Sequence, residues 1–360
     1  MKSSNQNFLK NKSNFVYLLI LFISFLLFVI FNRQKLFQRI YSDSIGVGLG
    51  VVNKYLKSQD ILDIENKIKD RVFVSDEEIY IASGYLYANG AKPTEYNFQH
   101  PPFIKYLFGI SSKYFNMPLL PNMFLGFILL LEVYFLGYLM FKNRITGLLG
   151  SLILLLDPVF KEVTIYALLD LGQMVFILGF LITTLYFKKH WIFQGILLGL
   201  AMASKFYSPV IIFLGIIYLY KLVTKQFNLK IELLVLSVSL LVFSLTYIAS
   251  FPFNIIFHQA KIIKFMLDHN QAIEWGGVIP MFFGGYFIWP VLFFVNLYQL
   301  FSSRVSDVRV LTYILPTIYY ILMCFQLPFT RYFILILPFL YLALGKFIIS
   351  TWIKMTPRTD

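Results

Sequence analysis

Long apolar runs separated by short polar segments make up most of the chain. A helix needs about 20 apolar residues to cross the hydrocarbon core of a bilayer, so runs near this length indicate membrane spans. The predicted spans are 15–31, 119–141, 145–158, 166–187, 191–203, 208–221, 231–251, 281–301, 310–326 and 332–350. Several are short, and 191–221 could form a re-entrant hairpin instead of two crossings. The pattern predicts an all-α polytopic membrane protein with about ten transmembrane segments.

Two longer segments interrupt the series of spans, at 32–118 and 252–280. In the first, apolar residues recur at helical spacing in two stretches, a pattern typical of amphipathic helices that lie on a membrane surface. The sequence "HPP" at 100–102 favours an extended break before the second of these helices. The sequence shows no internal repeat and no low-complexity linker. We expect a single domain over 1–360, without a soluble domain after the last span.

Composition supports the membrane class. Hydrophobic residues make up 58% of the chain and charged residues only 14%, whereas a typical globular domain has about 25% charged residues. The single cysteine, Cys324, excludes a disulfide framework and a cysteine-rich metal site. A net charge of +13 could suggest a nucleic-acid partner. The basic residues lie mainly between apolar runs, however, so membrane orientation explains the charge better.

Basic residues concentrate in cytoplasmic loops and so predict the orientation of the spans. Lys2, Lys10 and Lys12 place the N-terminus in the cytoplasm. The later basic clusters then all lie on the cytoplasmic side: Lys142 and Arg144; Lys188 and Lys189; Lys221, Lys225 and Lys230; Arg304 and Arg309; Lys354 and Arg358. The exception is the cluster Arg33, Lys35 and Arg39, at the start of a long loop, where the charge rule is weak. We expect a multi-pass plasma-membrane protein with both long segments outside the cytoplasm.

Ionisable residues within or beside membrane spans are costly and mark functional sites. On the predicted topology, the following all lie on the extracytoplasmic side: Asp76, Glu77, His100, Lys105, Asp157, Asp170, Lys205, His269 and Arg331. The carboxylates could accept a proton and the cations could hold an anion. This mixture suits transfer of a group from a phosphate-linked donor.

These residues also have structural interpretations. Asp76 and Glu77 could simply occupy the first turn of a helix, where its dipole favours acids. Lys105 could lie along an amphipathic helix with its stem on lipid. Lys205 could end a short helix, and Arg331 could anchor the last span at the membrane interface.

Three acids within spans differ in how easily structure explains them. Asp157 precedes Pro158 and is best interpreted as a helix-end residue. Glu132, in "LLLEVYF", is predicted to be a structural partner for another buried polar group, outside the site. Asp170 lies one turn inside an apolar helix and is harder to explain structurally.

Two motifs of the first long segment together resemble the membrane glycosyltransferases of the GT-C class. They are "DEEIY", with Asp76, Glu77 and Tyr80, and "HPPFIK", with His100 and Lys105. The combination is similar to protein O-mannosyltransferases and to the bacterial enzymes that modify lipid A with aminoarabinose. It implies that Asp76 is the catalytic base. His100 stands where the aminoarabinose enzymes have a lysine, so the match favours the mannosyltransferases.

The resemblance continues in the same order to about Leu344. The segments "YALLDLGQMVF", "GILLGLAMASKF" and "RY", and more weakly "HNQAIEWGG" and "FIWP", match family motifs. The matching positions are Asp170, Lys205, Arg331, His269, Trp275 and Trp289. The chain departs from the family pattern in lacking an arginine before Asp170 and in having Phe206 where a tryptophan is usual. The segment 252–280 is too short for the sugar-recognition domain of eukaryotic protein O-mannosyltransferases.

The resemblance implies transfer of a mannose-like hexose from a polyprenyl-phosphate donor to a hydroxyl acceptor, with inversion and without a metal or other cofactor. Asp76 and Glu77 would be catalytic. The residues expected to contact substrate or phosphate are His100, Lys105, Asp170, Lys205, His269 and Arg331. A secreted protein is the expected acceptor, and a glycolipid or cell-wall polymer is the alternative.

Two other functional classes fit a polytopic bundle with charges at the membrane. A lipid or sugar transporter usually shows repeated halves and broken helices near the membrane midplane, and the sequence shows neither a repeat nor centrally clustered charge. The other class is an inactive GT-C relative that serves as an assembly subunit.

Overall fold

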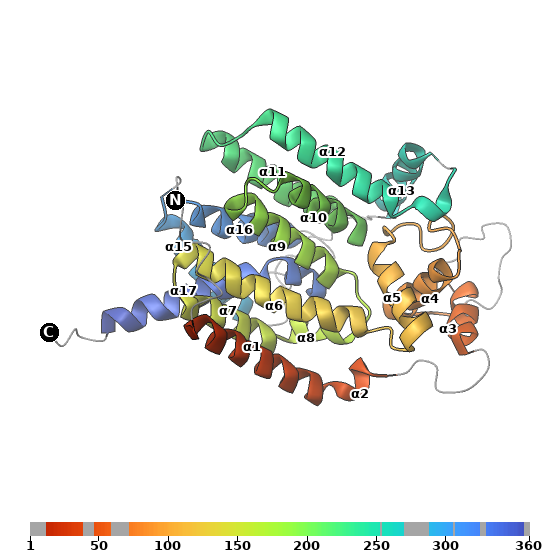
Figure 1. Cartoon of the computed structure of the whole chain (residues 1–360), viewed down its shortest axis with the longest axis horizontal. Helices are drawn as coiled ribbons and strands as arrows, with labels where there is room; N and C mark the ends of the chain where they lie inside the picture. Colours follow the sequence, from red (N-terminus) through yellow and green to blue (C-terminus); the bar gives the residue numbers. More distant parts are fainter. Residues whose placement is uncertain are drawn as a thin grey trace.

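The computed structural model describes residues 12–38, 47–58, 72–252, 254–269, 288–304, 307–324 and 329–355. Within these ranges the regular structure is helical, and the one β contact is an isolated bridge between Ser58 and Val72. This confirms the all-α prediction. Figure 1 shows an elongated helical bundle with a smaller group of helices at one end.

The bundle contains α1 (Lys12–Phe31), α6 (Leu120–Phe141), α7 (Arg144–Leu156), α8 (Pro158–Ile165), α9 (Asp170–Tyr186), α10 (Trp191–Ser204), α11 (Ser208–Val223), α12 (Leu229–Leu245), α15 (Ile288–Phe301), α16 (Arg309–Met323) and α17 (Leu337–Met355). The 3-10 helix η3 (Thr330–Leu335) leads into α17, and η1 (Ile248–Ser250) follows α12. The smaller group contains α3 (Val47–Leu56), α4 (Asp76–Ala88), α5 (Phe103–Phe115) and α13 (Ile255–His269), and the short α2 (Arg33–Leu36) follows α1.

The apolar helices of the bundle coincide with most of the predicted spans, although α12, in the predicted span 231–251, is not among them. Among the described residues, α6 and α17 are long and apolar enough to cross a membrane. The pair α8 and α9 meets the same criterion jointly, although the two helices are bent by 110° relative to each other. Six shorter apolar helices complete the set: 15–31 of α1, α7, α10, α11, α15 and α16. Residues 281–287 of one predicted span lie outside the described residues.

Two predicted span boundaries are wrong for a local reason. The predicted span 145–158 ends as a helix at Leu156, because Asp157 is the N-cap of α8. The predicted span 166–187 becomes helical only at Asp170. The segment 191–221 forms two separate helices, and α10 packs much more against α9 and α12 than against α11.

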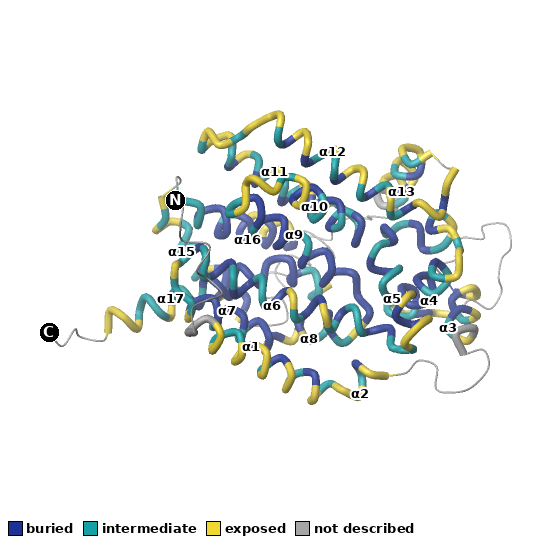
Figure 2. Tube along the Cα trace, viewed as in Figure 1, coloured by how far each residue is buried: buried dark blue, intermediate teal, exposed yellow. Residues whose placement is uncertain are grey.

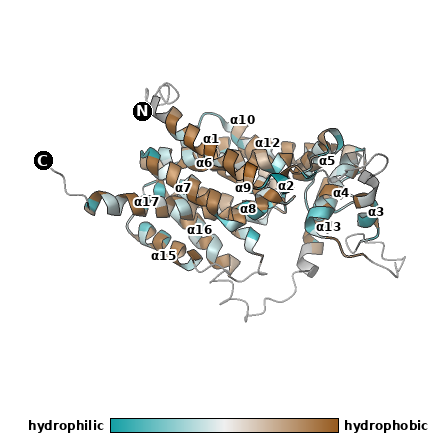
Figure 3. Cartoon of the chain, turned by 90° about the horizontal axis from the view of Figure 1, so that it is seen from below, coloured by the Kyte–Doolittle hydropathy of each residue, from teal (hydrophilic) through white to brown (hydrophobic). Residues whose placement is uncertain are grey.

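Exposed positions are frequent along the outer helices α1 and α12 (Figure 2), and hydrophobic residues predominate along α1 (Figure 3). Phe22 and Leu26 of α1, and Leu240 and Leu241 of α12, are exposed. Large exposed apolar surfaces mark contact with a partner or with lipid. On a bundle of apolar helices, this surface is the expected lipid-facing side.

Helices α4 and α5 approach each other at two glycines, Gly84 and Gly109. A Cβ atom at Gly84 would overlap the backbone carbonyl of Lys105, and one at Gly109 would overlap the backbone carbonyl of Gly84. The missing side chains therefore let the two backbones touch. This contact fixes the start of α4 relative to the segment that precedes α5.

Replacement of either glycine should separate the two helices, because the obstructing atoms are backbone atoms. We expect Gly84→Ala and Gly109→Ala each to cost about 1–3 kcal/mol of stability, measured as a lower thermal unfolding midpoint in detergent. Gly215→Ala is the matched control, because nothing lies within 4 Å of a Cβ atom at this helical position. The control should be neutral or slightly stabilising. Equal midpoints for Gly84→Ala and Gly215→Ala would contradict the close contact.

Candidate active site

The first turn of α4 carries three consecutive carboxylates, and the third has a structural role. Glu78 Oε2 accepts a hydrogen bond from the backbone N–H of Ser75, and the Ser75 hydroxyl accepts one from the N–H of Glu78. This reciprocal pair is a capping box. Glu78 also forms an ion pair with Lys54 of α3 at 2.5 Å. These contacts stabilise the start of the helix that carries Asp76 and Glu77.

The second carboxylate, Glu77, joins three parts of the chain. Its Oε2 accepts a hydrogen bond from Lys35 Nζ of α2 at 2.9 Å, and its Oε1 accepts one from the N–H of Ala167, between α8 and α9, at 3.3 Å. Lys35 Nζ also lies 4.7 Å from the ring centre of Tyr166. Lys35 was not predicted as a site residue. A signal was present, because Lys35 belongs to the one basic cluster that does not lie on the predicted cytoplasmic side.

The first carboxylate belongs to an ionic cluster of four residues from four segments: Asp76, Asp170, Lys205 and Arg331. Arg331 Nη2 donates to Asp76 Oδ2, and Arg331 Nε lies 3.9 Å from Asp170 Oδ2. Lys205 Nζ donates to Asp170 Oδ1 and lies 4.2 Å from the ring centre of Tyr332. Two acids and two cations make the formal charge of the cluster zero.

The cluster is covered on one side and open on the other. The side chain of Asp170 is 2% exposed and that of Arg331 is 15% exposed, whereas that of Asp76 is 41% exposed. Asp170 and Lys205 lie at the ends of α9 and α10, inside the bundle, and Asp76 begins α4 at its margin. An arriving molecule would therefore meet the Asp76 carboxylate first.

Lys105 and His100 lie beside this cluster. The fully buried Lys105 donates through Nζ to the backbone carbonyls of His100 and Asn97, at 2.7 and 2.8 Å, and to Asn97 Oδ1 at 3.1 Å. Lys105 therefore holds the turn that carries His100. The His100 ring packs edge-on against Tyr80, with 5.8 Å between ring centres. Its Nδ1 atom is buried without a hydrogen-bond partner among the described residues.

The charge state of His100 follows from these surroundings. Burial lowers its pKa well below the usual range, and the positive charges of Lys205, Lys105 and Arg331 lower it further. His100 is therefore an uncharged ring at neutral pH. An uncharged imidazole can donate one hydrogen bond and accept another.

Two acids within the predicted spans lie apart from the cluster. Asp157 Oδ1 accepts a hydrogen bond from the N–H of Val159 at 2.7 Å, and the Tyr341 hydroxyl donates to Asp157 Oδ2. This confirms the interpretation of Asp157 as a helix-end residue. The predicted polar partner of Glu132 is not found among the described residues. Its Oε2 is buried without a hydrogen bond, and its Oε1 lies beside Gly179 of α9.

The weaker motifs are only partly described. His269 is the last residue of α13, but its side chain and all of Trp275 lie outside the described residues. Trp289 is buried and stacks on Phe333 of η3, with ring centres 4.1 Å apart. Glu162 of α8, which sequence reasoning did not select, lies within electrostatic range of Arg331 and Asp170. It carried no motif that could have identified it.

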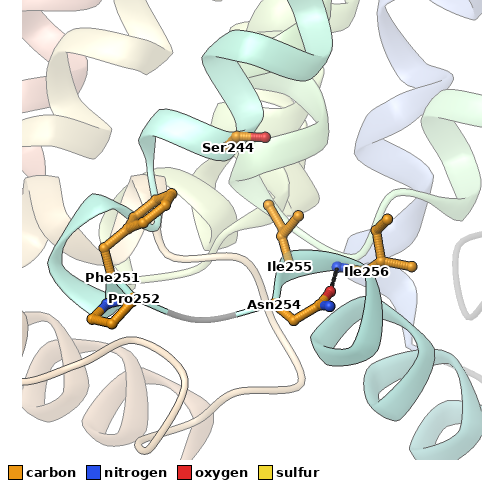
Figure 4. Close-up of a pocket in the computed structure, with 6 residues that line it drawn as sticks. All are labelled: Ser244, Phe251, Pro252, Asn254, Ile255 and Ile256. Carbon is orange, nitrogen blue, oxygen red and sulfur yellow. Dashed lines mark hydrogen bonds between the residues drawn. The ribbon is translucent and has the colours of Figure 1, made fainter.

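The described residues also bear on two other kinds of site, a metal centre and an apolar pocket. Within the described ranges, no group of three or more His, Cys, Asp or Glu side chains could hold a metal ion. An open pocket of about 600 Å³ lies at the turn from α12 to α13 (Figure 4), lined by Ser244, Phe251, Pro252, Asn254, Ile255 and Ile256. Because this lining has no ionisable side chain, the pocket suits an apolar group.

Comparisons with known proteins bear on the fold. No protein-family model and no curated protein matches the chain. Among solved structures, ArnT from Cupriavidus metallidurans bound to undecaprenyl phosphate is similar, with a TM-score of 0.61 and 17% identity. The apo structure of the same ArnT gives 0.60 and 15%. The protein has the GT-C fold. The similarity covers 86% of this chain, and the chain spans about three fifths of the length of ArnT.

The comparison thus confirms the predicted fold. The assignment to protein O-mannosyltransferases rests on His100 and stays a prediction.

The lowered pKa of His100 predicts how stability changes with pH. Such a histidine contributes stability above the unfolded-state pKa, near 6.5, and this contribution is lost as pH falls toward the folded-state pKa. We expect His100→Gln to reduce the decline of the thermal midpoint between about pH 7 and pH 5, by up to about 1.4 kcal/mol per pH unit. The exposed His190 provides the control, because His190→Gln should keep the wild-type profile. An undiminished decline in His100→Gln would show that His100 is not buried uncharged.

Proposed function

We propose that the protein is a membrane glycosyltransferase that transfers a sugar from a polyprenyl-phosphate-linked donor to a hydroxyl group of an acceptor. The ionic cluster carries this proposal, because the part-exposed carboxylate of Asp76 lies against Arg331, with Asp170 and Lys205 behind them. Such a site offers a base for the incoming hydroxyl and cations for the departing phosphate. The GT-C fold, shared with an ArnT structure that is bound to undecaprenyl phosphate, supports this class of donor.

In the proposed step, Asp76 accepts the proton of the acceptor hydroxyl while the hydroxyl oxygen bonds to the anomeric carbon. The bond between this carbon and the phosphate oxygen breaks, and polyprenyl phosphate leaves with the electron pair. Attack and departure occur on opposite faces, so the configuration inverts. Arg331 and Lys205 stabilise the charge that develops on the phosphate. No metal or other cofactor takes part in this scheme.

Donor binding would also change the pairing within the cluster. Arg331 binds Asp76 and lies near Asp170, whereas Asp170 has a second cation in Lys205. A donor phosphate would therefore displace Asp76 from Arg331 more readily than it would displace Asp170 from the cluster. The Asp76 carboxylate would then face the acceptor hydroxyl as the donor arrives.

The other predicted residues take supporting roles in this proposal. His100 would hydrogen-bond the donor as an uncharged ring, and Lys105 would act through it by holding its turn. Glu77 would position α4 through Lys35 and Ala167. His269 stays a predicted substrate contact.

The sugar and the acceptor form the finer part of the proposal. From the motif that contains His100 we infer a mannose-like hexose and protein O-glycosylation on the extracytoplasmic face of the plasma membrane. A glycolipid and a cell-wall polymer are the alternative acceptors. Glycan analysis of a deletion strain distinguishes the three.

Removal of the proposed base should abolish most of the activity. We expect Asp76→Asn to lower turnover of a polyprenyl-phosphate sugar by about 10²- to 10⁴-fold, because the amide cannot accept the hydroxyl proton. Glu78→Gln is the matched control, since it removes a carboxylate of the same turn that lies outside the cluster. The control should lose about 1 kcal/mol of stability through its cap and keep its turnover. Wild-type turnover in folded Asp76→Asn would remove Asp76 from the mechanism.

A second experiment separates the enzyme from the other functional classes. Purified wild-type protein in detergent, given a polyprenyl-phosphate hexose and a hydroxyl acceptor, should release free polyprenyl phosphate. Arg331→Gln should suppress this release, because the leaving group loses its cation. A transporter or an inactive subunit would leave the donor intact, so a wild-type protein without product under any acceptor tested would contradict the proposed function.

A further inference from the structure

A polar pocket of about 570 Å³ lies where α15, α16 and α17 meet, away from the ionic cluster. Its lining includes Arg304 and Ser303 after α15, Asp307 and Arg309 at the start of α16, and Lys346 of α17. The mechanism proposed above uses none of these residues. All of them lie on the side of the membrane that the basic residues predict to be cytoplasmic.

The length of α9 places this pocket at the far end of the bundle. Asp170 of the ionic cluster begins α9 and Tyr186 ends it, so the helix has 17 residues. A helix of that length spans about 25 Å. The hydroxyl of Tyr186 lies within electrostatic range of both Asp307 and Arg309. The pocket and the cluster are therefore separated by about the length of one helix.

The pocket carries excess positive charge. Arg309 pairs with Asp307 through its guanidinium and its backbone N–H. Neither Arg304 nor Lys346 has an ion-pair partner among the described residues, although Lys346 lies 6.0 Å from the ring centre of Phe141. Three cations and one carboxylate leave a surplus of two positive charges. Such a pocket favours an anion with several acceptor oxygens.

The surface beside the pocket is apolar. Phe294, Tyr298 and Phe301 of α15 are 60%, 56% and 84% exposed, and Trp352 of α17 is 65% exposed. Tyr298 packs edge-on against Phe347 of α17, so the two helices together form this surface. A free inorganic anion would not use it. A molecule with a phosphate group and acyl chains would occupy both the pocket and the apolar surface.

We propose that this pocket binds the headgroup of an anionic phospholipid, with the phosphate between Arg304 and Lys346 and the acyl chains along α15 and α17. Basic pockets between membrane helices on the cytoplasmic side bind such headgroups. The site lies one helix length from the ionic cluster and takes no part in sugar transfer. It would stabilise the packing of α15, α16 and α17.

The experiment measures lipid binding to the purified full-length protein by native mass spectrometry and by the shift of its thermal midpoint. The probes are phosphatidylglycerol, zwitterionic phosphatidylcholine and inorganic phosphate. We expect phosphatidylglycerol to bind wild-type protein about thirtyfold more tightly than the variant Arg304→Gln/Lys346→Gln, because two cations that attract the lipid phosphate are lost. Phosphatidylcholine and inorganic phosphate should give no comparable shift.

A variant with the same loss of charge elsewhere is the control. Lys230→Gln/Lys354→Gln removes two exposed cations from the same predicted side of the membrane, outside the pocket. It should bind phosphatidylglycerol as the wild type does. If both double variants bind phosphatidylglycerol equally weakly, the lipid binds through the general surface charge and the proposal is overturned. Stabilisation by inorganic phosphate alone would also overturn it. If the pocket double variant does not fold, Arg304→Gln alone, at an exposed position, decides between the same outcomes.

Discussion

The Arg331 guanidinium lies between two carboxylates, and the geometry of the candidate site depends on how it is held. Its pairing with Asp76 joins residues 255 positions apart in the sequence. The planar guanidinium presents several N–H groups at fixed angles, so one side chain can face both Asp76 and Asp170. Asp170 is almost completely buried, and its charge is offset by Arg331 and Lys205 together. Among the described residues, Asp76 pairs with Arg331. Arg331 therefore links the first turn of α4 to the buried end of α9, in addition to being the candidate anion contact.

Three sets of contacts position the first turn of α4 next to Arg331. The two glycines at the α4–α5 contact set the distance between these helices. Lys105 ties the start of α5 to the turn at Asn97 and His100, and Glu77 ties α4 to α2 and to the connection between α8 and α9. Neither Lys105 nor Glu77 needs to touch a substrate to be essential, since each fixes a group that would. A substitution of Lys105 or Glu77 would therefore alter the site by displacing the residues that contact the substrate.

The apolar runs predicted most of the helices, because membrane-length runs permit few other structures. The sequence motifs also singled out all four members of the ionic cluster as site residues. The roles assigned to these residues rest on the resemblance to GT-C enzymes. The helix end at Asp157 was predicted from the Pro158 that follows it, although the hydropathy pattern alone placed the end of the span at 158 and not at Leu156. The pairing of Lys35 was missed because its partner Glu77 lies 42 positions away in sequence, and no local pattern encodes such a contact. Glu162 was missed because it belongs to no motif. The prediction for Glu132 was wrong in the opposite direction. An acid in the middle of a span implies a buried polar partner, but Oε2 of Glu132 has no hydrogen-bond partner among the described residues.

The two ends of the bundle differ in electrostatic character, and the same helices connect them. The ionic cluster has no net formal charge, so an anionic donor must exchange one ion pair for another to bind there. The pocket at the far end has surplus positive charge and can accept an anion without breaking a pair. Both α16 and α17 contact η3, the segment that carries Arg331. The helices that would bind the headgroup therefore also pack against the segment that carries Arg331, although the two ends accept an anion by different means.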